Sequence, residues 1–409
     1  MGKDSQGNLG RTGRGGEMRV GIDARPLQGE TQFRGIGKSL DNLIKVFARE
    51  YSDVHSFVFY VDGDIATPSI IKEFPNSKVI AVDSPMLGRK RYARSVLNSY
   101  KKAKPSTSDV DVFLQYDASL GVPTSVPCVT EFYDLIPLLF KDKEKQHRVK
   151  GIRKYKNSLA RNLYWQKYLR TLKQYKYSKK LIAISEASKQ DYLGHTKSKQ
   201  DVRVVHLGTT GFDKSVGASK EIHKLTAKPF ILYVGGIDVR KNVVALIDTF
   251  YELKNEFPDM RLLNVGKEFG FENLLGDQGW HKALSVNSEY AKDILTPGFI
   301  SDEDLAWLYA KAMAFVFPSR YEGFGLPVLE AMQAGCPVVA YNNSSIPEVA
   351  GDAALLVPDG QTMVPAIKKI LQDKELRQDL VTKGKKRAAQ FTWEKTAKET
   401  LAVLEEVAR

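Results

Sequence analysis

The chain is poor in cysteine and histidine, and it lacks a long hydrophobic run. Its two cysteines, Cys128 and Cys336, lie far apart, so the sequence offers no disulfide framework and fits a reducing cytoplasm. The six histidines show no spacing typical of metal ligands, and we therefore expect no metal and no cofactor. No stretch of about 18 consecutive apolar residues occurs, which argues against a membrane-spanning helix. These absences exclude a disulfide-stabilised miniprotein and an integral membrane protein.

The composition that remains is that of an ordinary globular protein. The 409 residues are 43% hydrophobic and 27% charged, and this length predicts two or three domains. Lysine and arginine exceed aspartate and glutamate by 61 to 48, a surplus of 13 positive charges. Such a surplus favours an anionic partner, whether a nucleic acid, an acidic bilayer or a phosphate-bearing substrate.

The surplus of positive charge is concentrated in residues 141–180. This segment holds fifteen lysines and arginines against two acidic residues, so the formal net charge of the rest of the chain is zero. Aromatic residues alternate with the cations: Tyr155, Tyr164, Trp165, Tyr168, Tyr175 and Tyr177. We interpret residues 141–180 as a helical surface that docks on anionic lipid, or alternatively as a solvated face whose aromatic residues pack into the core. We expect no nucleic acid as partner, because no recognised binding module accompanies the charge.

The order of the expected elements predicts an α/β fold. Short apolar, β-rich runs alternate with helical patterns from Met18 onward, and a second such series begins near Phe230. We therefore expect two doubly wound, Rossmann-like domains with ligands bound outside the carboxyl ends of their strands. The expected parts are a disordered leader at 1–17, an N-terminal domain at 18–207, a linker at 208–228, a C-terminal domain at 229–385 and a last helix at 386–409 that packs back on the N-terminal domain.

A glycine loop joins the strand expected at residues 314–318 to a helix. Gly323 and Gly325 allow the backbone to come close to a ligand, and Pro327 suits the first helical turn. Free N–H groups at such a helix start favour an anion, especially a phosphate.

Two glutamates flank this loop. Glu330 lies early in the helix, where a carboxylate accepts hydrogen bonds from vicinal hydroxyls, and Glu322 approaches from the loop side. The alternative is a plain strand-to-helix turn, with Glu322 solvated and Glu330 favouring the helix N-terminus electrostatically. A glycosidase pair would need both carboxylates to flank one bond, which no spacing establishes.

Two adjacent cations follow the strand expected at residues 230–234. Arg240 offers a planar fork for oxygen pairs and Lys241 a mobile point charge, and together they suit a diphosphate. The alternative is a solvated basic helix start, which would be unfavourable against the helix dipole.

Together these segments resemble a known family. The pattern from Glu322 to Glu330 within PSRYEGFGLPVLEAMQAGCPVVA, with PGFISDEDLAWLYAKA before it and SSIPEVAGDAALLV after it, is similar to the retaining glycosyltransferases of family four, which have the GT-B fold. Residues 238–242, in GGIDVRKN, resemble a variant of the family's cationic segment in which Gly236 stands where an arginine is commoner. The resemblance covers most of the C-terminal domain.

The resemblance implies roles for individual residues. Glu322 would contact the donor sugar or its phosphates, Glu330 the nucleotide ribose, and Lys241 with Arg240 the diphosphate. The remaining implied contacts with the donor are the backbone N–H groups of Gly323, Phe324, Gly325 and Leu326, and the base-bordering residues Phe299 and Ile300.

In the N-terminal domain the resemblance is looser. Tyr133 and Asp134, in YDLIP, match a family segment whose first residue is a histidine near the donor sugar, so Asp134 either orients the substrate or caps a turn. Gly35 and Gly37, in RGIGKS, fit the family's first loop, which faces the phosphates, better than a nucleoside-triphosphatase P-loop; a plain glycine turn is the alternative. Ser185, in another shared turn, is either a helix N-cap or a ligand contact.

The expected function is retaining transfer of a hexose, mannose-like, from a nucleoside-diphosphate sugar to a glycan or lipid-linked acceptor. The combined motifs look most like bacterial mannosyl or rhamnosyl transferases of surface polysaccharide assembly, acting in the cytoplasm and peripherally on the inner face of the cell membrane. The alternatives are a noncatalytic nucleotide-sugar-binding protein and a nucleic-acid-binding protein.

Overall fold

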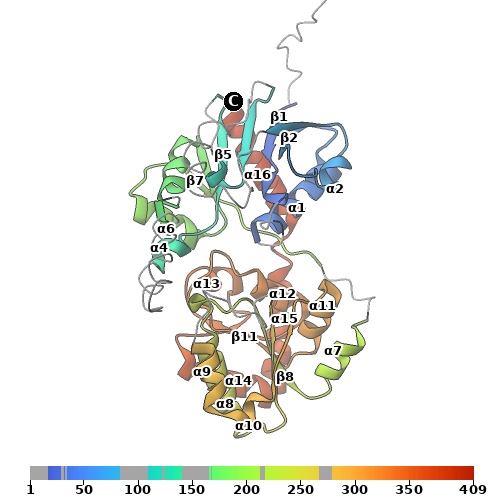
Figure 1. Cartoon of the computed structure of the whole chain (residues 1–409), viewed down its shortest axis with the longest axis vertical. Coiled ribbons are helices and arrows are strands. Elements are labelled where there is room, and N and C mark those ends of the chain that lie inside the picture. The colour runs from blue at the N-terminus through green and yellow to red at the C-terminus, as the bar shows by residue number, and fades with distance from the viewer. Residues whose placement is uncertain are drawn as a thin grey trace, which may run out of the picture. The chain divides into compact units, whose positions relative to one another are not determined.

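The computed structural model describes residues 17–28, 32, 35–82, 109–121, 125–140, 165–166, 168–211, 217–266 and 279–409. Within these ranges, strands and helices alternate along the chain as the sequence predicts (Figure 1). The expected leader lies almost wholly outside the described residues, as do Arg34 and residues 141–164 of the basic segment.

The first sheet has seven strands among the described residues, in the order β3-β2-β1-β4-β5-β6-β7. Its strands are β1 (Arg19–Asp23), β2 (Ser56–Asp62), β3 (Ser77–Val82), β4 (Val112–Gln115), β5 (Cys128–Phe132), β6 (Lys180–Ala183) and β7 (Val202–Val204). The pairs β1 with β2, β2 with β3, β1 with β4 and β4 with β5 are parallel, with Val20 opposite Phe57 and Val112. Every residue of β4 and β5 is buried, as expected for central strands of a parallel sheet.

The helices that accompany this sheet are short, apart from α1. They are α1 (Gly35–Glu50), α2 (Ser69–Lys72), α4 (Ile136–Leu139) and α6 (Glu186–Thr196), with single 3-10 turns at Arg25–Leu27, Ala118–Leu120 and Tyr175–Tyr177. In α1 the buried residues Leu40, Leu43, Ile44 and Phe47 recur three and four positions apart, which places them on one face of the helix.

The second sheet has six strands in the described ranges, in the order β10-β9-β8-β11-β12-β13. They are β8 (Phe230–Val234), β9 (Arg261–Val265), β10 (Ile294–Gly298), β11 (Ala314–Phe317), β12 (Val338–Tyr341) and β13 (Leu355–Val357), all paired in parallel. The strand order reverses between β8 and β11, and a doubly wound sheet binds its ligand at such a switch point. The prediction of two doubly wound sheets is therefore confirmed.

Helices surround the second sheet (Figure 1). They are α7 (Lys220–Leu225), α8 (Val243–Lys254), α9 (Gly279–Val286), α10 (Ser288–Ala291), α11 (Asp302–Lys311), α12 (Leu326–Ala334), α13 (Ile346–Ala350), α14 (Gly360–Gln372) and α15 (Lys374–Ala388), with a 3-10 turn at Val239–Lys241. The last helix, α16 (Trp393–Ala408), ends among the elements of the first sheet (Figure 1), where Glu406 forms an ion pair with Lys180 of β6. The last helix, expected at 386–409, corresponds to α16, which begins at Trp393.

The chain divides into two compact units, and the boundary between them differs from the boundary between the two sheets. The first unit comprises Met1–Glu131, Arg170–Leu181 and Thr400–Arg409; the second comprises Phe132–Leu169 and Ile182–Glu399. The segment after β5, helix α6 and the whole second sheet therefore belong to one unit. The domain boundaries expected from the sequence stay a prediction.

Candidate functional site

The candidate site is built from two loops at the switch point of the second sheet. One loop follows β8 and carries Arg240 and Lys241, and the other follows β11 and carries Glu322. Because β8 and β11 are hydrogen-bonded neighbours, their carboxyl ends bring these loops together. A backbone hydrogen bond from Arg320 N to Arg240 O, 2.8 Å long, joins the two loops directly.

The cationic turn after β8 is fixed by its own side chains. Tyr233, buried in β8, donates a 2.7 Å hydrogen bond to Gly236 O. Asp238 caps the 3-10 turn through its Oδ1, which accepts from Arg240 N at 3.1 Å. Lys241 Nζ then lies 5.1 Å above the centre of the Phe317 ring in β11. The turn thus aims both cations toward the β11 loop.

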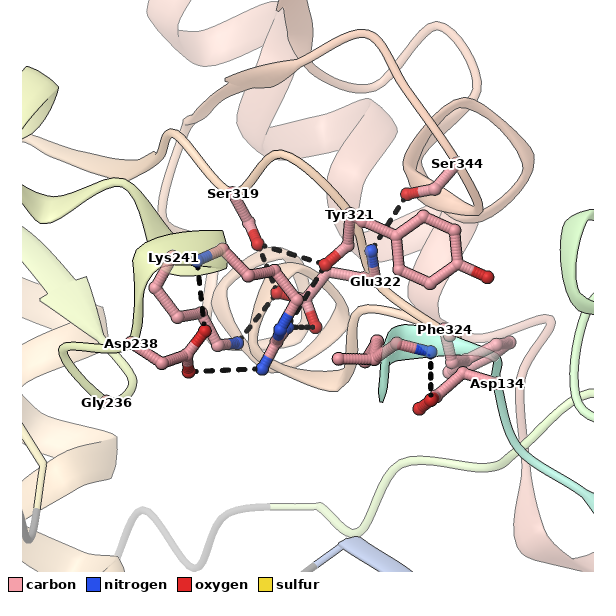
Figure 2. A network of polar contacts seen from close by, with 12 residues as sticks. Asp134, Gly236, Asp238, Lys241, Ser319, Tyr321, Glu322, Phe324 and Ser344 are labelled. Carbon is pink, nitrogen blue, oxygen red and sulfur yellow. Dashed lines mark hydrogen bonds and ion pairs between the residues drawn. The ribbon is translucent and has the colours of Figure 1, made fainter. Parts of the chain in front are cut away.

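Glu322 forms an ion cluster with both cations (Figure 2). Its Oε1 is 2.7 Å from Lys241 Nζ, and its Oε2 is 2.9 Å from Arg240 Nη1. Ser319 Oγ also donates to Oε1, and Glu322 N donates to Ser344 Oγ at 2.9 Å. Glu322 is only 8% exposed, so the alternative of a solvated carboxylate is wrong. The alternative of a solvated basic helix start is also wrong, because both cations are largely buried.

Lys241, Arg240 and Glu322 sum to one positive charge, which the half-buried Asp238, with its Oδ2 3.4 Å from Arg240 Nη2, offsets in part. Burial opposes ionisation of Glu322, but the charges of Lys241 and Arg240 outweigh it, so the pKa of the carboxyl lies below its ordinary value. Burial likewise opposes the charge of Arg240, yet Glu322 and Asp238 raise the pKa of its guanidinium. Two cations facing one carboxylate suit a further anion, such as a diphosphate.

The glycine loop after Glu322 has its carbonyl groups bound and its N–H groups unbound. Ser345 Oγ donates to the carbonyls of Glu322 and Phe324, at 3.0 and 2.8 Å, and Ser185 Oγ donates to that of Gly323 at 2.7 Å. In the part of the chain that the structure describes, no partner accepts from the backbone N–H groups of Gly323, Phe324, Gly325 or Leu326. These four donors lie just before or at the start of α12, where they favour an anion.

Both glycines of the loop are required by geometry. Gly325 has a φ of 103° and forms the N-cap of α12, and a Cβ there would lie 2.7 Å from Ile346 Cδ1. At Gly323 a Cβ would lie 2.8 Å from Tyr133 O, so the loop is in contact with the segment after β5. Any side chain at either position would displace the N–H groups.

The substitution Gly325→Ala is expected to lower the free energy of unfolding by about 1–3 kcal/mol, because alanine is strained at this φ and meets Ile346. The control is Gly194→Ala in α6, where a Cβ meets nothing within 4 Å and alanine should stabilise by about 0.5–1 kcal/mol. Urea unfolding of both variants checks the difference. Equal stability of the two variants would contradict the strain at Gly325.

Glu330 and Pro327 lie where the sequence predicts, in the first turns of α12. Glu330 is half-buried, and its Oε2 accepts a 3.1 Å hydrogen bond from Tyr309 of α11. Phe299, which is 76% exposed, and the half-buried Ile300 follow β10, with β9 between that strand and β8. Their predicted contact with a base stays a prediction.

Asp134 belongs to the same unit as the ion cluster. Its Oδ1 accepts from Ile136 N at 2.9 Å, which is the turn cap foreseen as one of its two roles. Burial raises the pKa of Asp134 to about 6, although the Ile136 N–H and the charges of Arg240 and Lys241 oppose the rise. Asp134 therefore lies within electrostatic reach of the cluster. Tyr133, before it, presents its carbonyl to Gly323.

Other predicted residues lie elsewhere or have structural roles. Gly35 and Gly37 open α1 in the first unit, and a Cβ at Gly35 would meet nothing within 4 Å, so packing does not require that glycine. Ser185 is the N-cap of α6 and accepts from Ser188 N at 3.0 Å. Cys128 and Cys336 are buried and free, as expected.

Several supporting residues were not predicted from the sequence. Ser319, Ser344 and Ser345 bind the glycine loop, and Tyr309 binds Glu330. The pair Ser344-Ser345 before Ile-Pro is typical of a helix start, and this pattern could have indicated where α13 begins. It could not have indicated which groups the two serines bind. Within the described ranges, no set of three or more His, Cys, Asp or Glu side chains is arranged to hold a metal.

The family described as Glycosyl transferases group 1 matches residues 217–387, which include the whole ion cluster. Among curated proteins, O-antigen chain mannosyltransferase B of Escherichia coli is 38% identical over 181 residues, which is 44% of this chain and 46% of that protein. The serotype-specific mannosyltransferase WbdA of Escherichia coli is 27% identical over 93% of this chain and 47% of its own length. This chain thus spans about half the length of these curated relatives.

Solved structures share the fold along almost the whole chain. Sucrose-phosphate synthase from Thermosynechococcus elongatus has a TM-score of 0.66 and 19% identity, covering 95% of this chain and 98% of its own. Anabaena HepE in complex with UDP-glucose has a TM-score of 0.66 and 16% identity, covering 95% and 100%. WaaG, a glycosyltransferase involved in lipopolysaccharide biosynthesis, has a TM-score of 0.62 and 16% identity, covering 95% and 99%.

Proposed function

We propose that the chain is a retaining glycosyltransferase of the group 1 glycosyl transferases, the family whose model matches residues 217–387, and that it uses a nucleoside-diphosphate sugar. Its two parallel sheets form the GT-B fold of the solved glycosyltransferase structures that it resembles. The observation that carries the proposal is the buried cluster of Arg240, Lys241 and Glu322 beside the unbound N–H groups of the glycine loop. Fixed cations and N–H donors in a buried site stabilise charge that develops on a diphosphate leaving group.

In the proposed reaction, Lys241, Arg240 and the loop N–H groups hold the diphosphate of the donor. As the bond between the sugar and the diphosphate breaks, negative charge grows on the leaving oxygen, and the positive charge of the cluster stabilises it. The acceptor hydroxyl attacks the same face of the sugar, and the leaving phosphate accepts its proton. Glu322 orients the donor, Asp134 orients the substrate, and Glu330 accepts hydrogen bonds from the ribose hydroxyls.

The proposed donor sugar is a hexose, with mannose favoured, and the proposed acceptor is a glycan or a lipid-linked glycan at the cytoplasmic membrane face. The names of the two Escherichia coli relatives, both mannosyltransferases and one of them for O-antigen chains, support this choice and a role in polysaccharide assembly. We propose that the reaction needs no metal and no other cofactor.

The proposal is tested by binding and turnover together. A thermal-shift panel of GDP, UDP and ADP and of their hexose derivatives should raise the unfolding midpoint for one nucleotide series, because a ligand that binds only the folded state stabilises it. Transfer of the matching sugar to a glycan acceptor, with the anomeric configuration kept, is the expected turnover. Binding without transfer or donor hydrolysis would instead establish a noncatalytic nucleotide-sugar-binding protein.

The pH dependence of transfer is expected to report on Asp134. Because the pKa of this carboxyl is raised to about 6 from 3.8, the folded protein holds the proton more tightly than the unfolded chain. The contribution of the protonated Asp134 to the free energy of unfolding is therefore fully present below about pH 4 and is lost as the pH rises through 6. If the ionised form orients the substrate, kcat/KM should rise with pH and level off above about 6.

The variant Asp134→Asn should lack this rise, because the amide does not ionise, and its kcat/KM should be lower at neutral pH by about 10–100-fold. Initial rates of both proteins between pH 5 and 8 give the profiles. Persistence of the same rise in Asp134→Asn would assign it to another group.

We also propose that residues 141–180 dock on an anionic membrane. Within the described ranges no helix has the length and apolar character to cross a bilayer, and Leu169 and Tyr177 are exposed large side chains in this segment. Trp165 and Tyr175 are buried, which fits the alternative of aromatic packing for these two.

Vesicles containing phosphatidylserine should therefore co-sediment the protein at low salt and release it at high salt, because lysine and arginine bind the surface electrostatically. Vesicles of phosphatidylcholine alone are the control. Equal binding to both, or none to either, would remove the membrane proposal.

A further inference from the structure

Another carboxylate, the half-buried Glu348, lies outside the ion cluster and accepts hydrogen bonds from three donors. It projects from α13 and accepts from Glu186 N at 2.8 and 2.9 Å, from Ala187 N at 3.3 Å and from the Nε2 position of His206 at 2.6 Å. Burial opposes its charge, but these partners outweigh burial and lower the pKa of the carboxyl. All of these residues belong to the second compact unit.

Through α6, Glu348 is connected to the glycine loop. Glu186 and Ala187 form the first turn of this helix, whose unpaired N–H groups carry partial positive charge that a carboxylate stabilises. Ser185 Oγ, at the start of the same helix, donates to Gly323 O at 2.7 Å. Ser188 Oγ donates to Tyr133 O at 2.7 Å and also lies 3.1 Å from Gly323 O. The helix start that Glu348 holds is therefore the one that holds Gly323.

Through His206, Glu348 is connected to the next residue of the loop. The imidazole ring lies 5.9 Å from the Phe324 ring and 5.5 Å from the Phe391 ring, centre to centre. Thr396 donates a 2.7 Å hydrogen bond to His206 O, which fixes the backbone of this residue. Glu348 is thus connected to the Gly323 carbonyl through the start of α6 and to the Phe324 ring through His206.

We propose that Glu348 and His206 are positioning residues, which orient the Gly323 and Phe324 N–H groups toward the diphosphate of the donor. The inference rests on the proposed function, and it adds a second set of side chains to the diphosphate site. The two residues fix the direction of the loop N–H groups before the nucleotide sugar binds. N–H groups that already point toward the diphosphate need no reorganisation on binding.

The charge of Glu348 is needed as well as its shape. A carboxylate presents only acceptor oxygens to the two N–H groups of α6 and to His206. The amide of Glu348→Gln keeps one acceptor oxygen but carries no charge, so its hydrogen bonds are weaker than those of the carboxylate. Glu348→Ala loses all of them.

The test compares Glu348→Ala, Glu348→Gln and His206→Ala with the wild-type protein. The control is Glu375→Gln, which removes an exposed carboxylate from the first turn of α15. Calorimetric titration with GDP and UDP gives Kd, and transfer assays give kcat and KM for the donor. We expect Glu348→Ala to raise Kd and donor KM by about tenfold, Glu348→Gln and His206→Ala by less, and Glu375→Gln to leave both unchanged.

Normal Kd and donor KM in Glu348→Gln and His206→Ala would overturn the inference, even if thermal stability fell, because a purely structural role moves stability alone. The Glu348→Gln variant keeps the test decisive if Glu348→Ala does not fold. Wild-type protein that binds neither GDP, UDP nor their sugars would overturn the proposed function and this inference together. If the wild-type protein binds a nucleotide and the variants have the same Kd and donor KM, only the inference about Glu348 and His206 is overturned, and the proposed function stands.

Discussion

Replacement of Lys241 by methionine is expected to lower kcat/KM for sugar transfer by about 10²–10³-fold. Lys241 Nζ is bound to Glu322 and lies over Phe317, so its charge is fixed where the diphosphate is proposed to bind. Methionine keeps the apolar stem over the ring and removes the charge, so folding should suffer less than turnover. Arg240 remains bound to Glu322 in the variant, which limits the loss of stability to about 2 kcal/mol.

Initial rates at varied donor concentration measure this effect, and circular dichroism with urea unfolding measures stability. The matched control is Lys369→Ala, which removes an exposed lysine from α14 and should change neither quantity. Wild-type turnover by a folded Lys241→Met protein would refute the role of the cation in stabilising the leaving group.

The substitution Glu322→Gln is expected to separate binding from turnover. Removal of the carboxylate leaves Lys241 and Arg240 without their shared anion, so the net charge of the site becomes more positive by one unit. A nucleoside diphosphate should then bind about tenfold more tightly, equivalent to about 1.4 kcal/mol. Turnover should fall by about 10²-fold, because Glu322 no longer orients the donor.

The same substitution should destabilise the unliganded protein by about 3–5 kcal/mol, because two buried cations lose their partner. A saturating nucleoside diphosphate should raise the unfolding midpoint of Glu322→Gln by more than it raises that of the wild-type protein. Glu256→Gln is the control, since it breaks an ion pair with Lys368 at the surface and should cost about 1 kcal/mol or less. Weaker nucleotide binding by Glu322→Gln would contradict the electrostatic argument.

The sequence predicts the fold and the residues of the ion cluster, but not their pairing. Alternation of apolar runs and helices is a local signal, and it places β8 and β11 at nearly their observed bounds. That these strands are neighbours, with Glu322 facing Lys241, depends on the crossover that reverses the strand order. A carboxylate expected to be free for a sugar is therefore found bound to two cations.

The supporting residues were harder to predict for a different reason. Serine is common in turns and at helix starts, so Ser185 and Ser345 carry no signal that distinguishes a cap from a bond to a distant carbonyl. Ser185 donates to the carbonyl of Gly323, 138 residues away. Ser345 donates to the carbonyls of Glu322 and Phe324, which are 23 and 21 residues away. Asp134 was assigned to the substrate or to a cap, and its cap is observed, while its raised pKa arises from burial that no local pattern reveals.

The tight seating of Gly323 bears on any attempt to redesign the protein for another donor. A side chain at this position would collide with the Tyr133 carbonyl, and one at Gly325 with Ile346, so neither glycine offers a position for new contacts. Library diversity is better directed at Phe299, whose ring is open to solvent. Substitutions there leave the serine-held loop intact, and if Phe299 borders the base as predicted, they would change the nucleotide preference.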